Sequence, residues 1–143
     1  MRYDRQILMP EIGIEGQKKL ERAVVTVIGC GGLGSPVLTY LAQAGVGTIR
    51  LVDGDIVSDT NLNRQFLYRE EDIGKKKADL AAEKLRRMNR GIRVEAFACA
   101  LTGENAGQIL KGSDVVVDCV DSLAVRCIVG RYCLAEDIFL VEG

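Results

Sequence analysis

Four glycines, Gly29, Gly31, Gly32 and Gly34, follow an apolar, β-branched run and precede a helical pattern. This G-x-G-x-x-G spacing lets the backbone approach a phosphate group, and the helix that follows offers free N–H groups at its start. Asp53 lies 24 residues after Gly29, at the end of the next apolar run, where its carboxylate can accept hydrogen bonds from ribose hydroxyls. These residues predict an adenine-nucleotide site rather than a purely structural turn. They do not distinguish NAD from ATP.

A set of polar and cationic side chains favours the triphosphate. Asn61 and Arg64 are three residues apart, so they share a face if this segment forms a helical turn. Lys77 begins the apolar stripe of a long helical pattern and should lean toward the sheet, whereas Lys75 and Lys76 should point to water. An amide, a guanidinium and an ammonium near a glycine loop suit a triphosphate better than the less charged pyrophosphate of a dinucleotide.

Asp121 directly follows the fourth expected strand, where the ligand crevice of a doubly wound sheet should open. A carboxylate there can hold Mg²⁺ against phosphate oxygens. The alternative is a helix N-cap, because Asp121 and Ser122 are both good capping residues before the next helical pattern. The sequence leaves both roles open.

The chain contains no histidine, so its chemistry must proceed without the usual general acid or base near neutral pH. Its five cysteines are an odd number and show no C-x-x-C spacing, which argues against a disulfide framework or a zinc site within this chain. We interpret them as reduced thiols, most of them buried, without a catalytic role. Cys30, inside the glycine loop, is the one expected to be sensitive to oxidation.

Strands and helices are expected to alternate along the chain. Continuous apolar, β-branched runs are typical of parallel strands that are buried on both faces. The expected strands are 23–29, 48–53, 92–99, 114–120 and 138–141, and the expected helices are 33–44, 74–89, 104–110 and 122–135. This alternation predicts an α/β fold with a doubly wound, Rossmann-like parallel sheet in the order 3-2-1-4-5.

The 143 residues are sufficient for one domain with an ordinary core, covering residues 23–143. Residues 1–22 are more polar, and we expect an arm that leads into a short helix outside the sheet. The net charge of −1 gives no overall attraction for nucleic acid or membrane, and no apolar run approaches a membrane span or a signal peptide. We therefore expect a cytoplasmic protein. Doubly wound folds with this beginning usually continue beyond a fifth strand, so we expect the N-terminal part of a longer domain.

Six motifs in the same order closely resemble the ThiF/MoeB/HesA family, the bacterial relatives of ubiquitin-activating enzymes. They are RYDRQ, GCGGLGS, YLAQAGVG, DGDIVSDTNLNRQ, GKKKAD and DCVDS…R. The resemblance runs from Arg2 to Gly143, and NLNRQ together with GGLGS is highly specific. It implies an adenylyltransferase that uses ATP and Mg²⁺ to adenylate the C-terminal glycine of a ubiquitin-like sulfur-carrier protein ending in Gly-Gly. Members of the family are typically homodimers.

The resemblance also implies a role for individual positions. Gly32 would approach the phosphates and Asp53 would bind the ribose, while Asp121 would serve Mg²⁺ and catalysis. Arg5 would reach into the ATP site of the neighbouring subunit and act there together with Arg64. The remaining nucleotide-binding positions would be Asp55, Asn61, Arg64, Gln65 and Lys77.

Two departures from the family pattern concern the substrate side of the site. Ser122 stands where members commonly have Asn, and Gly130 also replaces an Asn. The family's cysteine nucleophile and its zinc ligands have no counterpart in this chain. Two alternative functions stay open: an ATP-binding and dimerisation module without turnover, and an NAD(P)-dependent oxidoreductase. The second leaves Arg64, Lys77 and Asp121 without a role.

Overall fold

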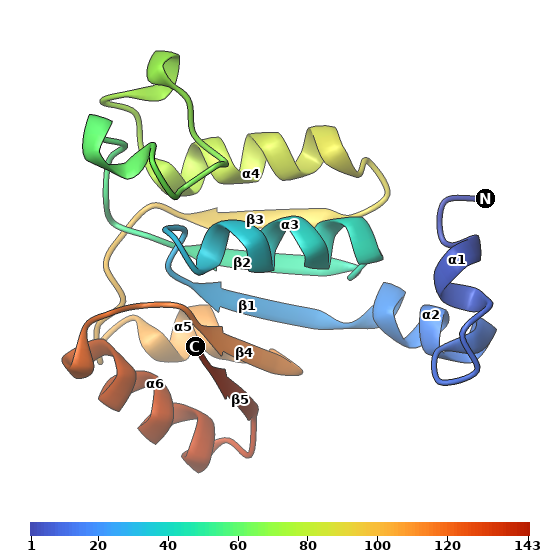
Figure 1. Ribbon diagram of the computed structural model, residues 1–143. Helices are drawn as coiled ribbons and strands as arrows, with labels where there is room; N and C mark the ends of the chain where they lie inside the picture. Colours follow the sequence, from blue (N-terminus) through green and yellow to red (C-terminus); the bar gives the residue numbers. More distant parts are fainter.

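The computed structural model describes all 143 residues, and its centre is a five-stranded parallel sheet (Figure 1). The strand order is β3-β2-β1-β4-β5, which confirms the predicted doubly wound topology. β1 pairs in parallel with β2 on one side and with β4 on the other, so the winding reverses between them. The strands are β1 (Val24–Ile28), β2 (Thr48–Val52), β3 (Arg93–Phe97), β4 (Val115–Asp118) and β5 (Phe139–Glu142).

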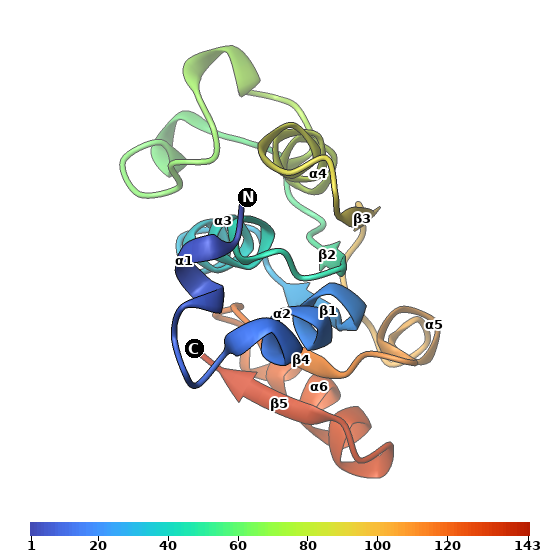
Figure 2. The ribbon, with the colours of Figure 1, turned by 90° about the vertical axis from the view of Figure 1, so that its right-hand side faces the viewer.

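Helices cover both faces of the sheet, because successive residues of a strand point to opposite faces. Val27 belongs to one core with Leu38 and Leu85, while Ile28 belongs to a second core with Val129. Figure 2 shows α3 and α4 on one side of the sheet and α5 on the other. No helix has both the length and the apolar character that a membrane span requires. The helices after β1 are α3 (Gly34–Ala44), α4 (Lys77–Met88), α5 (Ala106–Leu110) and α6 (Leu123–Ala135).

The N-terminal arm forms two helices, α1 (Asp4–Ile7) and α2 (Gly13–Arg22), and α2 leads directly into β1. They lie beyond one end of the sheet (Figure 1). Two glutamines attach the arm to the end of α3: Gln6 Nε2 donates to the Ala44 carbonyl at 3.0 Å and to Gln17 Oε1 at 2.7 Å, and Gln17 Nε2 donates to the same carbonyl at 3.2 Å. The arm is therefore fixed to the domain by specific polar contacts.

Tyr3 gives the arm a second attachment, at the left-handed turn that ends α3. Gly45 has φ +83°, and a Cβ on this residue would overlap the Tyr3 ring. Asn89 Nδ2 donates to the Tyr3 hydroxyl at 2.8 Å and to a carbonyl of α3 at 2.8 Å. Because Gly45 precedes β2 and α2 precedes β1, these contacts hold Arg5 at the amino-terminal edge of the sheet.

Several element boundaries differ from the predicted ones, most clearly before α4. The predicted helix begins at residue 74, whereas α4 begins at Lys77. Gly74 has φ +86°, and Lys76 forms an isolated antiparallel bridge with Ile56, so these residues join an extended segment instead. Two short 3₁₀ helices, 59–61 and 70–72, occupy the connection between β2 and α4, where only one helical turn is predicted.

Candidate functional site

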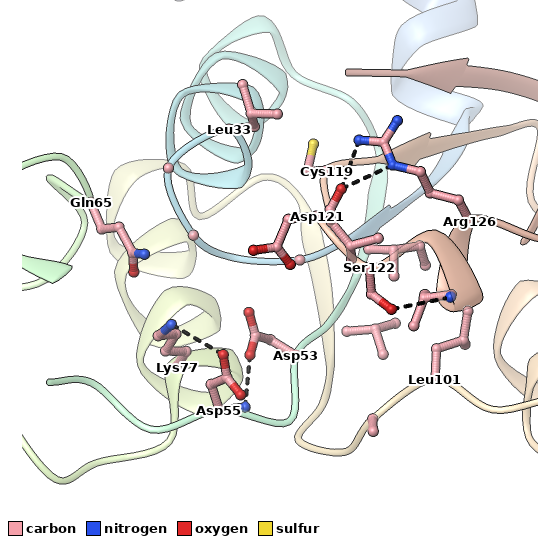
Figure 3. Close-up of a pocket in the computed structure, with 18 of the residues that line it drawn as sticks. Leu33, Asp53, Asp55, Gln65, Lys77, Leu101, Cys119, Asp121, Ser122 and Arg126 are labelled. Carbon is pink, nitrogen blue, oxygen red and sulfur yellow. Dashed lines mark hydrogen bonds and ion pairs between the residues drawn. The ribbon is translucent and has the colours of Figure 1, made fainter.

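A cavity of about 430 Å³ opens at the carboxyl ends of β1, β2 and β4. This is the point at which the strand order reverses, where ligands bind in doubly wound sheets. Most of the predicted site residues come together here although they lie in separate segments of the chain (Figure 3). Those that line the cavity are Gly29, Gly31, Gly32, Asp53, Asp55, Arg64, Gln65, Lys77 and Asp121.

The glycine loop is tightly packed under its exposed turn. Gly29 has φ +94°, and a Cβ there would lie 2.9 Å from the Cys119 carbonyl oxygen. A Cβ on Gly34 would overlap the Gly29 carbonyl, so this glycine serves close packing and does not line the cavity. Neither Gly31 nor Gly32 uses its backbone N–H in a hydrogen bond within the chain. The turn therefore presents free N–H donors at the start of α3, as a phosphate site requires.

Asp53 joins the glycine loop to the end of β2. Its Oδ2 accepts from the Cys30 N–H at 2.8 Å, and its Oδ1 accepts from the Asp55 N–H at 2.8 Å. Each carboxylate oxygen retains a lone pair, because an ionised carboxylate has about four acceptor sites. The carboxylate thus fixes two loops of the site and can still accept hydrogen bonds from a ligand.

Lys77 and Gln65 place two nearly buried polar side chains at the cavity wall (Figure 3). Only 5% of Lys77 is exposed, and its Nζ lies 3.4 Å from Asp55 Oδ2. Lys75 and Lys76 are exposed, as predicted. Gln65 is 4% exposed, and its buried Oε1 has no hydrogen-bond partner. An unpartnered buried oxygen at a cavity is a polar atom for which a bound ligand or water can supply the missing partner.

Arg64 is exposed and lies beside the glycine loop. A Cβ on Gly32 would lie 3.8 Å from Arg64 Cδ, while Arg64 Nη1 donates to the Thr60 carbonyl and to Asn63 Oδ1, both at 3.0 Å. These are two surface contacts within its own loop. The guanidinium can give up these two hydrogen bonds and bind an anion at little cost in folding stability, because exposed hydrogen bonds of this kind add little to stability.

Besides Gly34, two predicted site residues lie outside the cavity lining. Asn61 ends the 3₁₀ helix 59–61, and its Oδ1 accepts from the Ser58 N–H at 2.9 Å, so its side chain caps its own helix. Arg5 is at the opposite end of the sheet. Within one chain, neither the Asn61 nor the Arg5 side chain lines the cavity at the glycine loop.

Asp121 is free of the capping role that the sequence left open. Ser122 is the N-cap of α6, and its hydroxyl accepts from the Val125 N–H at 3.5 Å. The Asp121 carboxylate makes no hydrogen bond or ion pair within the chain and lies at the centre of the cavity view (Figure 3). It is therefore available to a ligand.

Sequence reasoning missed one charged residue and one wall of the cavity. Arg126 is part of the DCVDS…R motif but was given no role. An apolar wall formed by Val52, Leu101, Val120 and Val125 also lines the cavity. Val52, Leu101 and Val120 lie within two residues of the end of a predicted strand, so their position at the carboxyl edge was the available signal.

The cysteines are reduced, and three of the five are buried. The expectation that Cys30 is sensitive to oxidation is wrong. Burial, and then the charge of Asp53, raises the pKa of the Cys30 thiol well above its usual value of 9.0. A buried thiol that resists ionisation is a poor nucleophile. The exposed thiols are those of Cys99 and Cys127.

Comparison with known proteins finds relatives that are named as adenylyltransferases. The chain is 49% identical over 128 residues to the sulfur carrier protein adenylyltransferase of Thermus thermophilus, covering 90% of this chain and 47% of that protein. It is 46% identical over 143 residues to the mouse adenylyltransferase and sulfurtransferase MOCS3, covering 100% of this chain and 31% of that protein. The chain thus spans less than half the length of either relative.

Solved structures agree with the sequence comparison. The Escherichia coli tRNA N6-threonylcarbamoyladenosine dehydratase TcdA superposes with a TM-score of 0.92 at 32% identity, covering 99% of this chain and 59% of that chain. Its complex with ATP superposes with a TM-score of 0.87 at 34% identity, covering 91% of this chain and 54% of that chain. The profile of the ThiF family matches residues 3–143. The chain therefore belongs to the ThiF family.

Proposed function

We propose that the protein binds ATP with Mg²⁺ in this cavity and adenylates the C-terminal glycine carboxylate of a ubiquitin-like sulfur-carrier protein. One observation carries the proposal: a free carboxylate, Asp121, faces the glycine loop in the same cavity as Lys77 and Arg64. A dinucleotide site has no need of this combination. The two curated relatives, at 49% and 46% identity, are named as adenylyltransferases, and the TcdA structure with ATP supports the choice of nucleotide.

Each polar group of the cavity then has a place on the nucleotide. The free N–H groups of Gly31 and Gly32 bind phosphate oxygens, and Asp53 accepts from the ribose hydroxyls. Lys77 and Arg64 neutralise the triphosphate, and Gln65 donates to it from its Nε2 amide group, because phosphate oxygens only accept hydrogen bonds. In the free protein the Lys77 ammonium lies beside the Asp55 carboxylate, and a phosphate group of the nucleotide replaces this carboxylate as its partner.

Magnesium suits the donors that are present. The chain has no cluster of three or more metal-ligating side chains, so it offers no complete protein cage for a metal. Mg²⁺ commonly uses one or two carboxylates and takes its other ligands from water and substrate phosphates. Asp121 fits this pattern as the protein ligand, and the bound ion would neutralise charge on the phosphates.

The reaction needs no histidine, which this chain lacks. A glycine carboxylate is already ionised at neutral pH, so its oxygen can attack the α-phosphorus without a general base. The bond between the α-phosphorus and the bridging oxygen breaks, pyrophosphate leaves, and an acyl adenylate forms. The protein contributes positioning and charge neutralisation.

We further propose that the active form is a homodimer in which Arg5 of one chain serves the cavity of the other. Arg5 lies on α1, beyond the amino-terminal edge of the sheet, and the cavity lies at the carboxyl edge. A chain cannot fold its anchored arm back to its own cavity. The carrier's two terminal glycines suit a narrow approach to the α-phosphorus, because they have no side chains.

Carrier-dependent exchange of labelled pyrophosphate into ATP tests the proposal. Exchange should require a carrier protein ending in Gly-Gly and should be lost in Arg64→Ala and Asp121→Ala, while Lys76→Met, at an exposed lysine, serves as the control. ATP binding without exchange would leave only a nucleotide-binding module. Tight NAD binding that ATP does not displace would point to an oxidoreductase and refute the proposal.

A further inference from the structure

The backbone of Val120, the residue before Asp121, is held on both of its polar groups by the side chains of Asp118 and Arg126. Asp118 Oδ1 accepts from the Val120 N–H at 3.0 Å. The Val120 carbonyl accepts from Arg126 Nη2 at 2.7 Å and from Arg126 Nε at 3.2 Å (Figure 3). The next residue in the chain is Asp121, whose own side chain has no partner.

Asp118 is unusual for a carboxylate because it is completely buried. Its exposed fraction is 0%, and its Oδ2 has no hydrogen-bond partner. Burial, and then the charge of Asp118, raises the pKa of the neighbouring Cys119 thiol to about 11. A buried carboxylate with one oxygen unsatisfied is destabilising on its own. Its presence calls for a role other than stability.

The clamped segment is tied to the rest of the site. The Cys119 N–H donates to the Ile28 carbonyl at 2.8 Å, and the Cys119 carbonyl touches the position that a Cβ on Gly29 would take. Arg126 Nη2 also donates to the Gly143 carbonyl at 2.7 Å, beside β5. The backbone of Val120 is thus held between the glycine loop and α6.

We propose that Asp118 and Arg126 are positioning residues that hold the two peptide groups on either side of Val120 so that the Asp121 carboxylate points into the cavity. This role rests on the proposed function, in which Asp121 serves Mg²⁺-bound ATP. Because Asp121 makes no contact of its own, its direction is set by the backbone before it. Freeing that backbone would add conformations in which the carboxylate points elsewhere. Binding of Mg²⁺ and ATP would then have to order this residue, and the entropy cost would lower the binding constant by about tenfold.

The test compares ATP affinity with and without Mg²⁺ by titration calorimetry on the purified protein. The quantity of interest is the Mg²⁺ gain, the ratio of the two dissociation constants. Arg126→Met should reduce this gain by about tenfold; because the gain is a ratio, it cancels any direct effect of the lost charge on ATP affinity. Arg131→Met, at an exposed arginine of the same helix, should keep the full gain. Arg126→Lys should recover part of it.

Two further variants separate positioning from general damage. In the Asp121→Ala background the Arg126→Met change should have no further effect on the Mg²⁺ gain, because Arg126 acts through Asp121. Asp118→Asn keeps an acceptor oxygen for the Val120 N–H and should behave like the unaltered protein. Asp118→Ala removes the acceptor, and amide exchange at Val120 should become about fivefold faster.

The outcomes distinguish this role from the function on which it rests. If the unaltered protein fails to bind ATP in the presence of Mg²⁺, the proposed function is wrong and the role falls with it. If the unaltered protein shows a Mg²⁺ gain that Arg126→Met retains, or if the two changes multiply in the double variant, the positioning role alone is overturned.

Discussion

Lys77 provides a test in which stability and ligand binding should change in opposite directions. Its side chain is 6% exposed, and its one ionic partner, Asp55, is 77% exposed at a distance of 3.4 Å. The ammonium is therefore largely removed from water, and the attraction of one exposed carboxylate only weakly compensates for this loss of hydration. Replacing it by Met keeps an unbranched side chain of similar length and helix propensity on the buried face of α4.

The expected sizes follow from these contacts. Removing a poorly compensated buried charge should stabilise the free protein by ~1 kcal/mol, the lower end for replaced buried ion pairs. The loss of the ion pair costs the Asp55 carboxylate little, because this carboxylate is already exposed to solvent. A charge-assisted hydrogen bond to phosphate contributes about 1.5–3 kcal/mol, so the dissociation constant for ATP should rise by about 10- to 150-fold.

Two measurements on the same protein samples decide the question. Denaturant unfolding without ligand gives the change in stability, and calorimetry gives the affinity for ATP. Lys76→Met, one residue earlier and exposed, is the matched control and should change neither quantity by much. Our view of Lys77 as a ligand group held at the expense of stability would be refuted if Lys77→Met bound ATP as tightly as the unaltered protein, or if it unfolded more readily.

Three further predictions concern the surrounding structure. Burial acts to raise the pKa of Asp72, but the hydrogen bonds from Lys84 and the Arg69 N–H, together with the charges of Lys84 and Lys75, outweigh it and hold the pKa below the usual 3.8. Asp72→Asn should therefore be less stable than the unaltered protein at neutral pH. A carboxyl group whose pKa is lowered by folding stabilises the folded state only while it is ionised, so this difference in stability should disappear as the pH falls below about 4 in an unfolding series. A difference in stability that does not depend on pH would contradict this. Cys99 and Cys127 should react quickly with a thiol reagent while the other three cysteines stay slow, and a count other than two fast thiols would argue against this packing. Gly45→Ala should destabilise the protein by at least ~1–2 kcal/mol through its positive φ alone, and further because the new Cβ would overlap the Tyr3 ring. Denaturant unfolding measures the change, and unchanged stability would contradict the left-handed turn at Gly45.

The sheet could be predicted because its strands are buried on both faces. Runs such as Val24–Ile28 are β-branched throughout and show no alternation of apolar and polar residues, a pattern typical of parallel strands that helices cover on both faces. Right-handed crossovers limit the possible strand orders, and 3-2-1-4-5 is the usual order of a Rossmann-like sheet. The burial of Lys77 could also be predicted, since it begins the apolar stripe of a long helix.

Other features depend on contacts that no local pattern records. Asn61 shares a spacing with Arg64, but its side chain satisfies the nearby Ser58 N–H, a local hydrogen bond that competes with any ligand role. Arg126 was missed because its partner is a backbone carbonyl, and carbonyls leave no trace in the residue types. The hydrogen bond between Tyr3 and Asn89 joins residues 86 positions apart.

The anchored arm has a consequence for how activity would depend on dilution. Tyr3, Gln6 and Gln17 hold α1 at one end of strands that are about 16 Å long, and the cavity opens at the other end. If Arg5 takes part in the reaction, no isolated chain can complete its own site, however well it folds. Specific activity would then fall as the protein is diluted below the dissociation constant of the pair, even with saturating ATP. A cell would thereby obtain an enzyme whose output rises more steeply than its abundance.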